Sequence, residues 1–292
     1  MRKIYFAVAI ALLLVACGHK KNIPQGSGLI ETTEVTFSPQ IGGQLMTLYF
    51  DEGQNVISGD TLAMLDTTTV MLRLRQAEAA GEAAKNKVNI SGINIKQSSN
   101  TLSLANKEFK RISTLITSGS ANQQQLDQVQ NAMSQAQLAR DQAEATERTA
   151  QADLENANAQ IALLHKQVND CFPVSPVDGV VVDKFFEVGE LVAVGKPLVK
   201  IARLDTVWVK IYLPPADLTR ISLGGHALID PEDGSTKPLD GIITWISSEA
   251  EFTPKNVQTK EARAGLLYAI KITIANPNQI LKIGMPVMVT IQ

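Results

Sequence analysis

The sequence predicts an elongated protein of mixed α and β class. A small split β-sandwich is interrupted by a long antiparallel α-helical coiled-coil hairpin and is followed by a small antiparallel β-barrel. Three observations support this fold class: a glycine-punctuated segment that occurs twice, about one hundred residues of heptad spacing between its two copies, and a C-terminal region of short alternating strands. The formal net charge of −2 over 292 residues argues against nucleic acid as a partner.

Residues 1–16 have the features of a secretory signal peptide. Arg2 and Lys3 precede an apolar run from Ile4 to Val15, which is shorter than the roughly 20 residues that span a bilayer. The segment Leu14-Val15-Ala16-Cys17 resembles the lipobox of bacterial lipoproteins. We therefore expect a lipoprotein signal peptide over 1–16, acylation of Cys17, and an N-terminal linker over 17–28. The alternative is a plain signal peptide with an incidental cysteine.

The remaining cysteine and the histidines indicate no disulfide and no metal site. If Cys17 is acylated, Cys171 has no pairing partner, and we expect it to be a small buried apolar residue. The three histidines, His19, His165 and His226, lack the spacing of metal ligands. We expect no metal and no cofactor.

The internal repeat matches residues 43–65 with residues 179–201. Gly53 and Gly59 of the first copy correspond to Gly189 and Gly195 of the second, and in both copies the glycines separate short alternating runs. We therefore predict half of a β-sandwich over 29–66 and the other half over 171–203.

Residues 67–170 carry two runs of heptad spacing. Most seam positions are apolar in both runs, one from Val70 to Ile116 and the other from Leu126 to Val168, and the turn signal Ser118-Gly119-Ser120 separates them. Two helices of about fifty residues should fold back on each other and extend on the order of 70 Å. Gly81 and Ser91-Gly92 could interrupt the first helix.

The C-terminal region 204–292 contains five apolar alternating segments separated by turn clusters. They are 206–212, 226–229, 241–246, 267–274 and 285–291. Such a pattern predicts a small antiparallel β-barrel, and Pro214-Pro215 predicts the start of a short helix.

The split repeat resembles the biotinyl/lipoyl-like domain in the form found in periplasmic adaptor proteins, the membrane fusion proteins of the HlyD type. The turns lack the flanked lysine that carries a swinging cofactor, so a carrier role is disfavoured. Three segments of the C-terminal region, 205–209, 250–263 with 267–269, and 281–287, look like those of adaptors that partner ABC-type exporters. The resemblance implies a lipid-anchored periplasmic protein that assembles into a ring, expected to be a hexamer.

The resemblance also implies a docking site at the hairpin turn. Adaptors that reach a TolC-like outer-membrane channel carry an Arg, a Leu and a Ser around this turn. Arg111 and Leu115 fall on the first two positions, Ser118 and Gly119 form the turn, and Asn122 stands where the serine is expected. Asn122 could serve as a helix N-cap. The alternatives are that Arg111 is a solvated helix residue and that Leu115 closes the seam.

A second contact site is expected in the polar loop between the last strands. Phe252, Lys255, Gln258 and Arg263 would touch the transporter or a neighbour in the ring. A simple connection over the barrel mouth is the alternative.

No catalytic motif is found, so we expect no enzyme. Gly195-Lys196-Pro197 lacks the spacing and hydroxyl of a P-loop, and Ser118-Gly119-Ser120 lacks the frame of a nucleophile elbow.

The expected function is that of a periplasmic adaptor between an inner-membrane ABC exporter and a TolC-like channel. The alternatives are an adaptor of a proton-driven RND pump, a structural coiled-coil lipoprotein, or a module that binds a ligand in its barrel. Inner-membrane anchoring is expected, although Gly18 stands where enterobacterial retention uses Asp.

Overall fold

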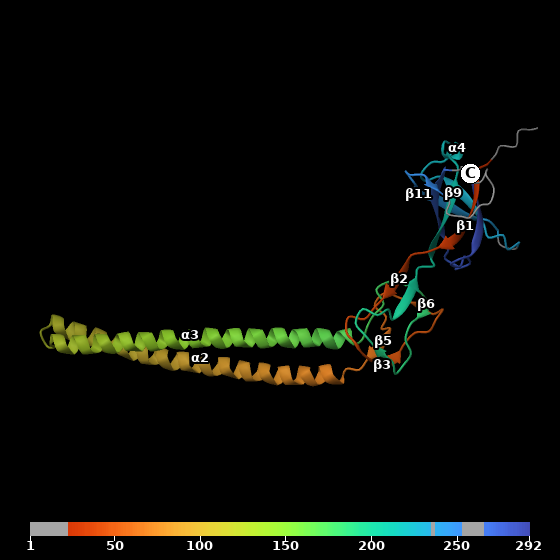
Figure 1. The fold of residues 1–292 in the computed structure, drawn as a ribbon. Helices are drawn as coiled ribbons and strands as arrows, with labels where there is room; N and C mark the ends of the chain where they lie inside the picture. Colours follow the sequence, from red (N-terminus) through yellow and green to blue (C-terminus); the bar gives the residue numbers. More distant parts are fainter. Residues whose placement is uncertain (1–22, 235–236, 253–265) are drawn as a thin grey trace, which may run out of the picture.

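The computed structural model describes residues 23–234, 237–252 and 266–292. The chain forms a helical hairpin, a β-sandwich at the base of the hairpin, and a β-barrel beyond the sandwich (Figure 1). The expected signal peptide and Cys17 lie outside the described residues. Within these residues no helix is long and apolar enough to cross a membrane.

The hairpin consists of α2 (Thr68–Thr117) and α3 (Gln123–Asp170). Every seam position that the heptad spacing predicts is buried or half-buried, from Val70 to Ile116 on α2 and from Leu126 to Val168 on α3. Two of the fully buried seam residues on α3 are alanines, Ala136 and Ala150, which allow close approach of the backbones. The predicted coiled-coil hairpin is therefore confirmed.

The first helix continues through both of its glycines. At Gly81 an added Cβ would lie 2.8 Å from Cδ1 of Ile161, so the glycine leaves room for an apolar side chain of the facing helix. Ser91 is buried, and its hydroxyl donates to the Val88 carbonyl at 2.8 Å. These residues make the seam narrow without ending the helix.

The β-sandwich is built from both sides of the hairpin. One sheet has the order β2-β8-β6-β4 and the other the order β5-β3-β7. The strands of the first half are β2 (Glu34–Phe37), β3 (Gly43–Leu48), β4 (Asn55–Val56) and β5 (Ala63–Leu65), and those of the second are β6 (Gly179–Lys184), β7 (Leu191–Val192) and β8 (Val199–Ala202). Since β4 pairs with β6 and β3 with β7, neither half forms the sandwich alone.

The two halves are related by an internal two-fold symmetry that reaches individual hydrogen bonds. The N–H of Gly53 donates to Val181 at 2.9 Å, and the N–H of Gly189 donates to the equivalent Leu45 at 2.7 Å. Four of the six glycines of the repeat, at positions 53, 59, 189 and 195, have positive φ. The repeat seen in the sequence is therefore a repeat of structure.

The barrel is closed by six strands in the order β11-β10-β14-β1-β9-β13, with β13 pairing back to β11 and β12 added beside β13. The strands are β1 (Gln25–Glu31), β9 (Thr206–Leu213), β10 (His226–Asp230), β11 (Leu239–Ile246), β12 (Glu251–Phe252), β13 (Leu266–Ala275) and β14 (Pro286–Ile291). The five predicted C-terminal strands all form. The short helix α4 (Pro215–Leu218) begins at the predicted prolines.

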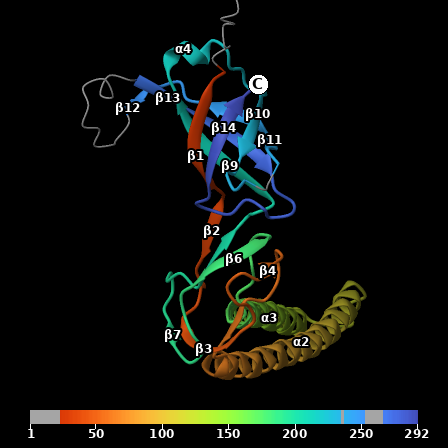
Figure 2. The same cartoon turned by 90° about the vertical axis from the view of Figure 1, so that its right-hand side faces the viewer.

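The structure differs from the predicted boundaries in the place of β1. Residues 25–31, expected partly as linker and partly as the first half of the sandwich, form the barrel strand between β14 and β9 (Figure 2). At Gly28 an added Cβ would lie 2.5 Å from the Lys210 carbonyl oxygen and 2.6 Å from a Val209 methyl. Gly28 therefore serves close packing of two strands, although in sequence it resembles a linker residue.

Candidate functional site: the tip of the hairpin

The turn between the two helices is held by a Schellman motif. The N–H of Ser120 donates to Leu115 at 2.8 Å, and the N–H of Gly119 donates to Ile116 at 3.0 Å. Gly119 has φ of +72°, the left-handed conformation that ends a helix with little strain only at glycine. The end of α2 therefore has a defined geometry, as the turn signal in the sequence indicates.

The second helix begins with a capping box. The Asn122 side chain accepts a hydrogen bond from the Gln125 N–H at 2.9 Å, and the Gln125 side chain accepts from the Asn122 N–H at 3.0 Å. This arrangement satisfies two donors that the start of a helix leaves unpaired. Asn122 is thus an N-cap, as predicted, and its side-chain oxygen is occupied within the turn.

Arg111 and Leu115 both remain accessible on the last turns of α2. The side chain of Arg111 is 68% exposed and pairs with Glu108 at 2.5 Å, while Leu115 is 37% exposed. The pair with Glu108 is an i,i+3 surface contact, which binds the arginine weakly. Leu115 is not enclosed in the seam, because Ile112 and Ile116 take the inward positions. Both side chains can therefore meet a partner.

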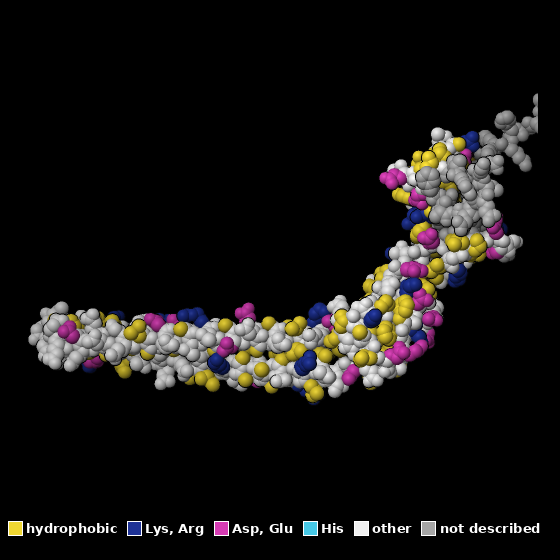
Figure 3. All heavy atoms as spheres, in the orientation of Figure 1, with side chains coloured by type: hydrophobic (Ala, Val, Ile, Leu, Met, Phe, Trp, Pro, Cys, Tyr) yellow, Lys and Arg dark blue, Asp and Glu magenta, His cyan; other side chains and the backbone are white. Residues whose placement is uncertain are grey.

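The surface around the turn is polar and carries little charge. In Figure 3 the end of the hairpin shows mainly uncharged atoms together with an acidic group, and further charged groups lie along the helices. Moving an uncharged polar group out of water costs less free energy than moving a charged group. A tip of this composition, with Leu115 and Arg111 beside it, is suited to contact with exposed carbonyls and apolar side chains of another helical end.

A basic groove on the flank of the hairpin was not predicted from the sequence. It has a volume of about 400 Å³ and is lined by Ser99, Leu102, Ser103, Asn106, Lys107, Lys110 and Arg140. Arg140 pairs with Glu144 on its own helix. The i,i+3 spacing of Lys107 and Lys110 places both side chains on one face of α2. This spacing is the feature of the sequence from which a basic surface could have been predicted. The groove adds a second candidate contact surface, on the flank of the hairpin.

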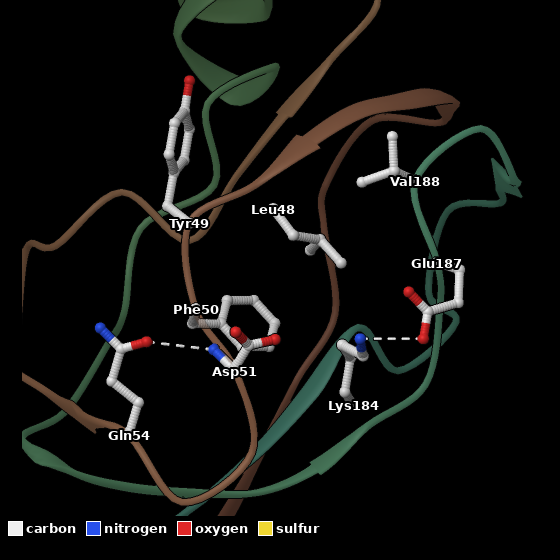
Figure 4. A pocket seen from close by; sticks show the side chains of 8 residues that line it. All are labelled: Leu48, Tyr49, Phe50, Asp51, Gln54, Lys184, Glu187 and Val188. Carbon is white, nitrogen blue, oxygen red and sulfur yellow. Dashed lines mark hydrogen bonds and ion pairs between the residues drawn. The ribbon is translucent and has the colours of Figure 1, made fainter.

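A pocket of about 430 Å³ lies where equivalent turns of the two sandwich halves meet (Figure 4). Lys184 pairs with Glu187 at 2.8 Å, and this hydrogen bond raises the pKa of the lysine above its ordinary value. A lysine held charged in this way is a poor nucleophile. The pocket therefore gives no support to a carrier or catalytic role for Lys184.

The barrel interior is filled by its own side chains. Val209, Ile229, Ile243, Ile272 and Val289 belong to one buried apolar cluster that occupies the space between the strands. This packing argues against the alternative of a ligand held inside the barrel. Across the described residues, no group of three or more His, Cys, Asp or Glu is placed to hold a metal ion.

The predicted contact loop near the end of the chain is largely outside the described residues. Lys255, Gln258 and Arg263 fall in the range 253–265, and for Phe252 only the backbone, in β12, is described. Their role stays a prediction.

Comparison with known proteins identifies the family. Residues 33–203 match the family model described as the barrel-sandwich hybrid domain of RND membrane fusion proteins. A UPF0194 membrane protein of Acidithiobacillus ferridurans is 38% identical over 138 residues, 47% of this chain and 41% of that protein, so the matched segment spans less than half of this relative. A UPF0194 membrane protein of Citrobacter koseri is 27% identical over 289 residues, 90% of this chain and 87% of the relative.

The fold is shared with a solved structure. MacA from Actinobacillus actinomycetemcomitans superposes with a TM-score of 0.68 at 20% identity, over 92% of this chain and 78% of that one. The family match takes in both halves of the sandwich and the whole hairpin, which is more than half of the chain. The chain therefore belongs to the membrane fusion protein family with the RND-type barrel-sandwich hybrid domain.

Proposed function

We propose that this chain is the periplasmic adaptor of a tripartite export system, anchored by a lipid on Cys17 and joined through its hairpin to a TolC-like outer-membrane channel. The observation that carries this proposal is the accessible, doubly capped tip at the end of two helices of 50 and 48 residues. At 1.5 Å per residue such arms extend about 70 Å. A hairpin of this length buries little surface of its own, so its use lies in reaching a distant partner.

The coupling partner in the inner membrane is proposed to be an ABC exporter, on the resemblance of the barrel segments. An RND pump is the second candidate, because the matching family model is described for RND membrane fusion proteins. In both cases the chain works as a ring of copies, with the barrel and sandwich on the transporter side and the hairpins on the channel side. No residue of the chain performs chemistry in this mechanism.

The proposal is tested by photo-cross-linking in cells. A photoreactive amino acid replaces Ser120 in the turn, and a matched variant carries the same amino acid at Thr149, an exposed position on the shaft of α3. We expect an adduct with an outer-membrane channel from position 120 and none from position 149. Absence of a channel adduct, in membranes that contain the intact chain, would instead support a structural lipoprotein.

The energy source is tested separately. The tagged full-length chain is purified from lightly cross-linked membranes and its companions are identified by mass spectrometry. Recovery of an ABC permease with its ATPase supports the ABC exporter as the partner. Recovery of an RND subunit supports the RND pump instead. Recovery of neither transporter contradicts the adaptor role.

A further inference from the structure

The outer wall of the barrel has a groove that the adaptor mechanism described above does not use. Its volume is about 510 Å³, and it is lined by Trp208, Lys210, Thr244, Trp245 and Lys271, which come from β9, β11 and β13. These three strands are neighbours in the barrel (Figure 2). Both tryptophans of the chain therefore lie on one side of the barrel.

The two lysines of the groove are placed against each other. Lys210 and Lys271 are direct cross-strand partners on β9 and β13. Like charges at such positions destabilise a sheet. Each ammonium instead lies over an indole: Lys271 Nζ is 4.2 Å from the ring centroid of Trp208, and Lys210 Nζ is 5.9 Å from that of Trp245. The rings offset part of the repulsion.

Within the described part of the chain, the exposed Glu31 lies beside the groove as the cross-strand partner of Trp208, but it forms no ion pair with either lysine. Among residues 23–234, 237–252 and 266–292, neither Lys210 nor Lys271 forms an ion pair. Trp245 is 42% exposed and contributes nothing to the barrel core, which is filled by other residues. Tryptophan is enriched at the centres of protein interfaces.

The barrel also carries the complementary charge, at a different place. Asp230, Glu232 and Asp240 are exposed around the turn that joins β10 to β11, where they outnumber the exposed Lys237, and Asp240 contacts His226. Asp230 is the cross-strand partner of Met288 on β14, so this turn lies toward the β10 and β14 side of the barrel. A basic aromatic surface and an acidic turn at different places on one body fit a head-to-tail contact between copies, which closes into a ring.

We propose that the groove lined by Trp208, Lys210, Thr244, Trp245 and Lys271 receives the acidic β10–β11 turn of a second copy of this chain. The inference rests on the proposed function in so far as that function requires a ring. It assigns the contact between neighbouring barrels to charge pairing of Lys210 and Lys271 with Asp230 and Glu232 of the adjacent copy.

The experiment places a photoreactive amino acid at Thr244 in the full-length chain in its native membranes. Gln25, an exposed residue of β1, carries the same amino acid as the control. We expect position 244 to give an adduct of two chains, with the cross-linked peptide of the second copy mapping to residues 226–241. Adducts to another protein, adducts to phospholipid, or a chain that remains uncross-linked at position 244 would each overturn the inference.

Charge exchange provides the second arm. Lys210→Glu with Lys271→Glu should lower the yield of the two-chain adduct at least tenfold. Co-expression with a second copy carrying Asp230→Lys and Glu232→Lys should restore it. Lys282→Glu, a single reversal at an exposed position of the same barrel, should leave the yield unchanged. If the double reversal prevents folding, Lys210→Gln with Lys271→Gln makes the same test, and an unchanged yield in a folded variant contradicts the inference.

The outcome can be separated from that of the proposed function. A channel adduct from Ser120 without a two-chain adduct from Thr244 leaves the adaptor role in place and removes this interface. A two-chain adduct from Thr244 without a channel adduct from Ser120 supports this interface and contradicts the adaptor role.

Discussion

Gly53 and Gly189 adopt the same left-handed backbone conformation in equivalent turns of the two sandwich halves, with φ of +81° and +96°. Each donates its N–H to the central strand of the opposite half. Nothing lies within 4 Å of a Cβ added at either position. The glycines are therefore required by backbone conformation and not by space.

Replacing either glycine by alanine should destabilise the protein by a similar amount, about 1–2 kcal/mol, because both pay the same penalty for a left-handed L-residue. The measurement is the urea midpoint of each single variant by circular dichroism. Asparagine at either position should cost less, since it tolerates this conformation better. Clearly unequal losses from the two alanine variants would contradict the structural equivalence of the turns.

Asn122→Ala should lower the stability of the hairpin end by about 1 kcal/mol, because the Gln125 N–H loses the side-chain oxygen that accepts its hydrogen bond. Hydrogen exchange of the first turn of α3 measures the effect locally. Asn122→Ser keeps a capping oxygen and should exchange at nearly the wild-type rate. Equal exchange in the alanine variant would show that the cap contributes nothing.

The two glycines of α2 provide a matched pair. Gly92→Ala meets only the Glu147 carboxylate at 3.8 Å, so it should stabilise the protein by about 0.5–1 kcal/mol through helix propensity. Gly81→Ala must displace the Ile161 methyl, so its gain should be smaller, and Gly81→Val should destabilise by about 1–3 kcal/mol through overpacking. Thermal unfolding ranks the three variants. The same gain at both glycines would disprove close packing at Gly81.

Arg111→Ala with Leu115→Ser should reduce the channel adduct formed from position 120 while leaving the melting temperature within a few degrees of wild type, because both side chains are accessible. The matched control is Arg148→Ala on the exposed shaft of α3, which should leave the adduct unchanged. A full-strength adduct in the double variant would remove these two residues from the docking surface.

The junction between sandwich and hairpin should be sensitive to acid. The hydroxyl and the backbone N–H of Thr68 donate to Asp66 at 2.6 and 2.8 Å, and these hydrogen bonds hold the pKa of that carboxyl below its usual range. The folded state has the lower pKa, so the stabilisation is complete above the unfolded pKa of about 3.9 and is lost as the pH falls through the folded pKa. The melting temperature should therefore fall more steeply between pH 5 and pH 2 for the wild type than for Asp66→Asn. Titration followed by NMR should give a higher pKa for the Asp66 carboxyl in Thr68→Val than in the wild type, because valine removes the hydroxyl that donates to it.

Elements whose signal is local could be predicted from the sequence. The heptad seam, the glycine turns, the five C-terminal strands and the buried Cys171, which is 1% exposed, all follow from spacing and residue type. Strand β1 could not be bounded in this way. Its partners β9 and β14 lie at the far end of the chain, and Gly26 and Gly28 weaken its β-propensity.

The candidate sites likewise include features that depend on residues close in sequence and features that depend on distant ones. The Schellman turn and the Asn122 cap follow from residues that are close in sequence. The basic groove needs Lys107 and Lys110 of one helix to meet Arg140 of the other, and the groove on the barrel needs three strands in register. Such contacts depend on tertiary pairing, which one sequence does not reveal.

The barrel is closed by pairing its first strand with its last, since β1 lies between β9 and β14. Ribosomes deliver the chain from its N-terminus, so residues 25–29 have no partner in β14 until nearly the whole polypeptide has been synthesised, although Ile30 and Glu31 can pair with β9 earlier. The helical hairpin, whose contacts are much closer in sequence, has no such delay. We therefore expect the barrel to be the last part to fold, and a chain truncated before Pro286 to expose β1 to proteases even though its hairpin is complete.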